Sequence, residues 1–204
     1  MKNTTLFGLF FLLYTFTSCL PLATSDHVFD TDGEIVRNGG TYYILPAIKG
    51  NGGGIEKAAT GKETRALTVV QSGNDDSKGL LITISSPARI IQIYPGLALD
   101  ISFASQPRSA SWTIVEDLPE GPAVKLTGYK GTVVAGRFKI QKASHYSNAY
   151  KLVFCRIDGR TCGDIGIHVD DDGNRRLVLT HENNPLLVQF QKLDHHQLHQ
   201  APLA

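Results

Sequence analysis

Short runs of β-branched and aromatic residues, separated by glycine and proline, constrain the fold of this chain more than any other feature of its sequence. Such runs are typical of β-strands, and the glycines and prolines between them are typical of turns. The runs occupy residues 67–71, 79–84, 90–93, 98–103, 112–115, 123–126, 137–141, 150–154, 165–169, 176–179 and 187–190. No window of the sequence has a sustained helical period with capping residues. The sequence therefore predicts an all-β domain, either a sandwich or a closed barrel.

The first 25 residues have the composition of a secretory signal peptide. Lys2 is the only charge before Asp26, residues 6–22 are mostly apolar, and small residues precede Asp26. A membrane anchor is the alternative, but Thr, Ser and Pro interrupt the apolar run, which is short for a membrane span. We expect cleavage before Asp26, no membrane contact afterwards, and a protein that is secreted or delivered to the vacuole.

Charge and cysteine content exclude some classes of partner. Removal of residues 1–25 takes away Lys2 and leaves 19 basic residues against 19 acidic ones. Binding to nucleic acid or to an anionic membrane normally needs a basic excess, so neither partner is expected. Cys19 is removed as well, and in a secreted protein the remaining pair, Cys155 and Cys162, predicts a disulfide. A zinc site is the alternative, but no second Cys/His cluster stands at ligand spacing.

Residues 28–45 contain two closely spaced turns, and the second of these leads into an aromatic and β-branched run. The spacing resembles the signature of plant Kunitz (soybean-type) protease inhibitors, with matches at Val28, Asp30, Gly33, Val36, Tyr42 and Ile44. Further motifs similar to that family extend over residues 26–194. The resemblance implies a β-trefoil, a capped barrel built from three strand-rich units, and a monomer. We expect residues 195–204 to form a disordered tail.

A short segment between two of the predicted strands is the candidate functional loop. It contains one arginine before two isoleucines, and Pro87 favours an extended backbone around it. The resemblance to trypsin-inhibiting Kunitz proteins implies that Arg89 is the specificity residue and that Arg89–Ile90 is the scissile bond. The expected partner is a trypsin-like serine protease, and the flanking loop residues are Ser86, Pro87, Ala88 and Ile91.

Two further implications of the resemblance concern support of this loop. Asn38 matches a family asparagine whose side chain hydrogen-bonds the carbonyl groups on the inner side of the loop. The usual family member has a second disulfide, whose positions here are Arg65 and Ser105. Without that bridge, either barrel packing and Asn38 hold the loop in an inhibitory shape, or the loop is mobile and the protein is cut as a substrate.

The remaining motifs predict no catalytic, cofactor or metal site. Acidic turns at residues 30–33 and 170–173 lack the spaced acids and final Glu of a calcium loop, and no nucleophile motif of a hydrolase is present. The chain is therefore expected not to be an enzyme. Two other functions stay open: inhibition of cysteine or aspartic proteases through another loop, and a non-inhibitory storage or ligand-binding role on the same scaffold.

Overall fold

The computed structural model describes residues 26–104, 111–143, 148–158, 161–180 and 184–193. Within these ranges the chain forms thirteen β-strands and no helix, and hence no helix that could cross a membrane. The predicted signal peptide, the predicted tail and the domain boundary at Asp194 lie outside the described residues. The strands are β1 (Gly40–Pro46), β2 (Ile55–Ala58), β3 (Thr68–Gln71), β4 (Ile82–Ser85), β5 (Asp100–Phe103), β6 (Trp112–Glu116), β7 (Ala123–Leu126), β8 (Thr132–Val134), β9 (Gly136–Lys142), β10 (Tyr150–Arg156), β11 (Cys162–Val169), β12 (Arg175–Thr180) and β13 (Leu187–Lys192).

Six strands close a barrel. Antiparallel pairing runs from β5 through β4, β1, β13 and β10 to β9. The ring is completed where Leu99, just before β5, pairs with Phe138 of β9 and donates its N–H to the Phe138 carbonyl at 2.8 Å. Closure leaves these strands without an exposed edge.

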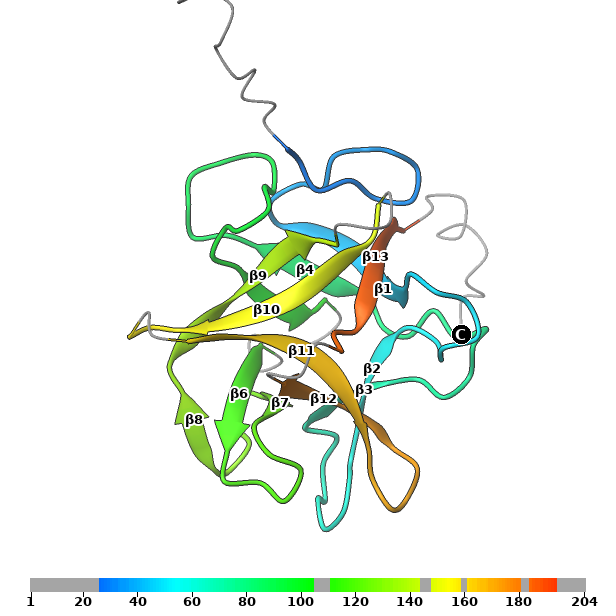
Figure 1. The fold of residues 1–204 in the computed structure, drawn as a ribbon, viewed down its shortest axis with the longest axis vertical. Coiled ribbons are helices and arrows are strands. Elements are labelled where there is room, and N and C mark those ends of the chain that lie inside the picture. The colour runs from blue at the N-terminus through cyan, green and yellow to red at the C-terminus, as the bar shows by residue number, and fades with distance from the viewer. Residues whose placement is uncertain (1–25, 105–110, 144–147, 159–160, 181–183, 194–204) are drawn as a thin grey trace, which may run out of the picture.

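Three hairpins cap one end of the barrel (Figure 1). They are β2–β3, β6–β7 and β11–β12, and their second strands, β3, β7 and β12, all pair with one another. Each hairpin lies in the sequence between two barrel strands, so the chain consists of three similar units at residues 40–85, 100–142 and 150–192, with β8 as an addition to the second unit. This architecture is a β-trefoil, and the predicted all-β class is confirmed.

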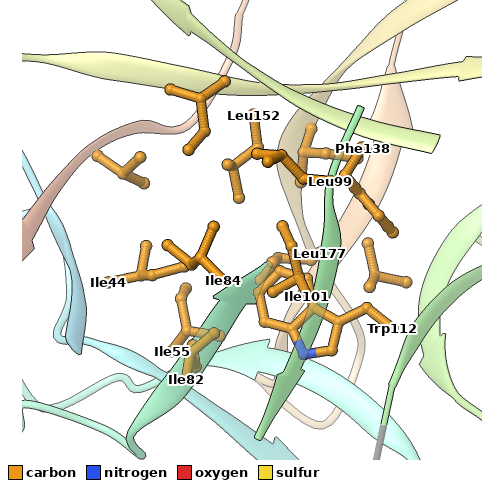
Figure 2. Packing of buried hydrophobic residues seen from close by; sticks show 14 of the residues in the cluster. Ile44, Ile55, Ile82, Ile84, Leu99, Ile101, Trp112, Phe138, Leu152 and Leu177 are labelled. Atoms are coloured by element: carbon orange, nitrogen blue, oxygen red, sulfur yellow. The ribbon is translucent and has the colours of Figure 1, made fainter. Parts of the chain in front are cut away.

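Buried and less buried residues alternate along the barrel strands, and the buried ones fill the core. In β4 and β5 the partners Ile84 and Ile101 are both buried, and in β1 and β13 Ile44 lies opposite the buried Phe190. Side chains from all three units meet inside the barrel, as Figure 2 shows. Trp112, at the start of β6, is 6% exposed and belongs to this core. A close-packed core of this kind holds the strand ends, and therefore the loops between them, in fixed positions.

One predicted strand is wrong. Residues 90–93 form no strand, and only Gln92 makes an isolated bridge, to Arg37. Within this β-branched run, Ile91 is 79% exposed while Ile93 is fully buried. Two strands were missed: β2 is short and carries charged residues, and β8 has only three residues.

Candidate functional site

The predicted loop, residues 86–91, joins β4 to β5 and lies at the upper end of the molecule in Figure 1, away from the cap hairpins. Pro87, Ala88 and Arg89 are exposed, and so is Ile91. Ser86 and Ile90 are half-buried. The loop therefore presents the Arg89 side chain to solvent between two partly covered positions.

The Asn38 side chain lies under this loop and bonds to its backbone. Its Nδ2 group faces three carbonyl oxygens, those of Ser86 and Ala88, each at 3.3 Å, and that of Ile90 at 2.9 Å. Its Oδ1 atom accepts the N–H of Ser86 at 2.7 Å. One amide side chain thus contacts the backbone on both sides of the exposed Arg89, and it uses donors and acceptor together.

Main-chain hydrogen bonds fix the two ends of the loop to the same turn. Gly39 donates its N–H to the carbonyl of Ile84, just before the loop, at 2.8 Å. Asn38 donates its own N–H to the carbonyl of Ile91, at the far end of the loop, also at 2.8 Å. The loop therefore has its entry, its interior and its exit bonded to two consecutive residues.

The turn that carries Asn38 is itself held by the core residue Tyr42. The Tyr42 hydroxyl accepts the N–H of Arg37 at 2.9 Å, and the Tyr42 side chain is only 3% exposed. Gly39 has a φ of 76°, which glycine adopts without strain, and a Cβ at Gly40 would lie 2.7 Å from the Tyr42 ring. Tyr42 was expected only as a signature position. The turn dipeptide Gly39-Gly40 followed by a buried tyrosine is the sequence signal that could have pointed to this contact.

Two bonds within the loop shape it further. The N–H of Ala88 is donated to the Ser86 hydroxyl at 3.3 Å, and the N–H of Ile90 is donated to the Ala88 carbonyl at 2.9 Å. Arg89 therefore sits at the apex of a tight local turn of backbone. A loop with few free backbone groups loses little conformational freedom when a partner binds it.

The predicted disulfide between Cys155 and Cys162 is present, and it joins directly paired residues of β10 and β11. Arg65, at one position of the absent family bridge, is exposed in the β2–β3 turn. Ser105, the other position, lies outside the described residues. Across the described parts of the chain, no group of three or more His, Cys, Asp or Glu side chains is arranged to hold a metal ion.

A large hollow of the described surface lies elsewhere, between the cap hairpins. It measures about 830 Å³ and contains none of residues 36–40 or 86–93. Its floor is a network of charges from all three units. Lys125, 1% exposed, contacts Glu63 at 3.0 Å and Glu120 at 3.6 Å, and Arg176 contacts Glu120 at 2.6 Å and Asp170 at 2.7 Å.

The ionisation of these acids follows from their partners. Burial works against the charge of Glu120, but its backbone N–H and Arg176 outweigh that effect and lower its pKa. For Asp170, partial desolvation is likewise outweighed by hydrogen bonds from Asn174 and by Arg176, so its pKa falls to about 2. Each of the five charged side chains of this network therefore has a partner of opposite charge, and the network is a cross-link between units.

The fold and the braced loop define a β-trefoil protein with an exposed arginine on a hydrogen-bonded loop. A family model of trypsin and protease inhibitors, the Kunitz legume family, matches residues 28–192, and the chain belongs to that family. Trypsin inhibitor A of Glycine max is 47% identical, over 97% of this chain and 95% of its own length.

Solved structures agree with this assignment. The complex of porcine pancreatic trypsin with soybean trypsin inhibitor contains an inhibitor chain 49% identical, with a TM-score of 0.75, covering 83% of this chain and 100% of that one. Winged bean albumin 1 is 34% identical, with a TM-score of 0.73, over 82% of this chain and 99% of that one. The predicted family and the predicted β-trefoil are confirmed.

Proposed function

We propose that this protein inhibits trypsin-like serine proteases by offering the Arg89–Ile90 bond to the active site as a substrate. The observation that carries the proposal is the contact of Asn38 with three loop carbonyls beneath the exposed Arg89. The relatives named as trypsin inhibitors, and the structure of soybean trypsin inhibitor with porcine trypsin, support the same partner. The protein acts as a bound ligand of the protease and not as an enzyme.

The geometry accounts for tight binding without turnover. Proteases bind extended segments through main-chain pairing, with side chains in pockets. A loop held in one shape avoids part of the ordering cost of association, and an arginine forms a charge-assisted pair with a pocket carboxylate. If the peptide bond is cut, Asn38 and the end bonds keep the new termini next to each other. Resynthesis then competes with release.

Titration of active trypsin tests this proposal. We expect stoichiometric loss of trypsin activity with the mature protein and no loss with Arg89→Glu, because the reversed charge cannot enter a pocket that selects cations. Lys49→Glu, an exposed residue in the β1–β2 connection, is the matched control and should inhibit like the parent. Full trypsin activity at excess parent protein would refute the proposal.

A different set of results would support the other functions. Inhibition of papain or of an aspartic protease that is unchanged by Arg89→Glu would place the active surface on another loop. The likeness to winged bean albumin 1 is the observation that favours a non-inhibitory role, since that protein is named as an albumin. Absence of inhibition across all three protease classes would favour it here.

We also propose that the mature protein begins at Asp26 and follows the secretory pathway to the outside of the cell or to the vacuole. The disulfide between Cys155 and Cys162 supports an oxidising compartment, and the charge-poor leader supports export. Expression of the full chain in plant cells, followed by N-terminal sequencing, should give Asp26 as the first residue. An intact N-terminus on cytosolic protein would contradict this route.

A further inference from the structure

The residue that follows the proposed scissile pair, Ile91, has an exposure that the core does not explain. The residue is 79% exposed, although its backbone carbonyl is hydrogen-bonded to the N–H of Asn38. When a partner covers a large apolar side chain that was exposed to water, the free energy of the complex is lowered. We propose that Ile91 is a second specificity-determining residue, which selects serine proteases with an apolar S2′ subsite. This inference rests on the function proposed above.

The backbone around Ile91 is rigid enough for such a role. The Ile91 carbonyl accepts the N–H of Asn38 at 2.8 Å, and the next residue, Gln92, bridges to Arg37. One residue further, Ile93 is fully buried and donates its N–H to the Val36 carbonyl at 2.9 Å. The chain is therefore anchored at the Ile91 carbonyl and at the two residues that follow it, and the Ile91 side chain can be buried by a partner without first ordering this stretch.

The residue next to Ile91, Gln92, belongs to a small group of bonded polar side chains. The Gln92 Oε1 atom lies 3.0 Å from His27 Nε2 and accepts the Tyr94 hydroxyl at 3.4 Å, and the His27 and Tyr94 rings pack with centroids 4.6 Å apart. All three side chains are half-buried. An apolar anchor beside a bonded polar group has the composition of the centre and rim of a protein interface. The partner that fits is a protease surface with an apolar subsite and polar surroundings.

Position 91 should therefore decide between proteases that share the preference for arginine. An apolar subsite gains from covering Ile91, whereas a subsite lined by carboxylates would have to bury charge against an aliphatic group. Arg89 gives the same contribution to both classes of protease. The difference in affinity then comes from position 91, and replacement of Ile91 by a cation should reverse the order.

The test compares inhibition constants for two trypsin-like proteases, one with an apolar and one with an acidic S2′ subsite. Ile91→Ala should weaken inhibition of the first about ten- to thirtyfold and change the second little, as expected for loss of a covered aliphatic side chain. Ile91→Arg should favour the second protease. Ile157, 81% exposed on the β10–β11 connection, provides matched controls, because Ile157→Ala and Ile157→Arg should leave both constants unchanged.

The outcomes separate this inference from the function on which it rests. Parent protein that inhibits both proteases, with Ile91→Ala equal to it on each, would overturn the role of Ile91 and leave the inhibitory loop intact. Parent protein that inhibits neither would overturn both. Equal melting temperatures of parent and variants, expected because both isoleucines are exposed, show that any change lies in binding and not in folding.

Discussion

At the scale of single residues, Asn38 connects the scaffold to the proposed function. Its side chain replaces a strand partner for the loop: it bonds to three carbonyls and one N–H that a neighbouring β-strand would otherwise satisfy. Because a side chain and not a strand bonds to the loop, the loop can bulge outward and expose Arg89. A continuous β-ladder would hold the loop flat. The shape of the loop thus depends on one amide.

Replacement of Asn38 should therefore make the protein a weaker inhibitor that trypsin cleaves more readily. Asn38→Ala removes four hydrogen-bond contacts, each with a net contribution of about 0.5–1.5 kcal/mol, and water replaces part of them. We therefore expect binding to trypsin to weaken by about 2–3 kcal/mol, which is a rise of roughly 30- to 150-fold in the inhibition constant. Cleavage at Arg89–Ile90 during long incubation should rise as well. Asn74→Ala, in a different turn, is the control. An unchanged inhibition constant for Asn38→Ala would show that packing alone holds the loop.

At the scale of elements, two acidic turns are built in the same way. Asp30 accepts the N–H groups of residues 32 and 34, and Asp170 accepts those of residues 172 and 174. Both acids act as hydrogen-bond acceptors within their turns, as expected from the absence of calcium-loop spacing. In the β11–β12 turn Asp170 also binds Arg176, and this joins the turn to the charged floor of the hollow.

The pH dependence of the free energy of unfolding should reveal the contribution of Asp170 in this turn. The folded pKa of Asp170, about 2, lies below its ordinary value of 3.8, because hydrogen bonds from Asn174 and the charge of Arg176 outweigh the effect of desolvation. Its stabilising contribution is therefore complete above pH 3.8 and is lost as the pH falls from there toward 2. Urea midpoints measured from pH 7 to pH 2 should fall less steeply in Asp170→Asn than in the parent. Asp172→Asn, an exposed acid of the same turn, should follow the parent curve.

At the scale of the whole molecule, the loop and the charge network occupy opposite ends of the trefoil (Figure 1). The network joins the three units through Glu63 of the first, Glu120 and Lys125 of the second, and Arg176 of the third. Lys125 also bonds to Thr68 at 2.7 Å and lies 4.7 Å from the centre of the Tyr129 ring. Stability and inhibition should therefore be separable.

Removal of the central cation tests that separation. Lys125→Met should lower the free energy of unfolding by about 3–5 kcal/mol, because it leaves acids without their buried partner, while the trypsin inhibition constant of the folded protein stays the same. Adding Glu63→Gln should restore part of the loss, since one uncompensated charge is removed. Denaturant unfolding and trypsin titration of the same samples measure both quantities. If Lys125→Met weakened trypsin inhibition and left the free energy of unfolding unchanged, the expectation would be contradicted.

The sequence by itself determined the all-β class, most strand positions and, through family motifs, the trefoil and the candidate loop. Strand periodicity and turn residues are local signals, so they could be recognised without contacts. The same signals failed at residues 90–93, where a β-branched run resembles a strand although Ile91 within it is exposed. Periodicity cannot tell burial in the core from exposure that a partner would cover.

The family resemblance already implied Asn38 as a support of the loop, but only the tertiary structure decided which atoms it bonds, what holds its turn and what joins the three units. Asn38 reaches carbonyls about fifty residues away, Tyr42 holds the turn that carries it, and Lys125 meets Glu63 from another unit. These contacts depend on barrel closure, which brings distant segments together at distances that no sequence spacing encodes. The sequence predicted Arg89 as a specificity residue by resemblance. The geometry around it added Ile91 as a second residue to test, because exposure on a fixed backbone is visible only in three dimensions.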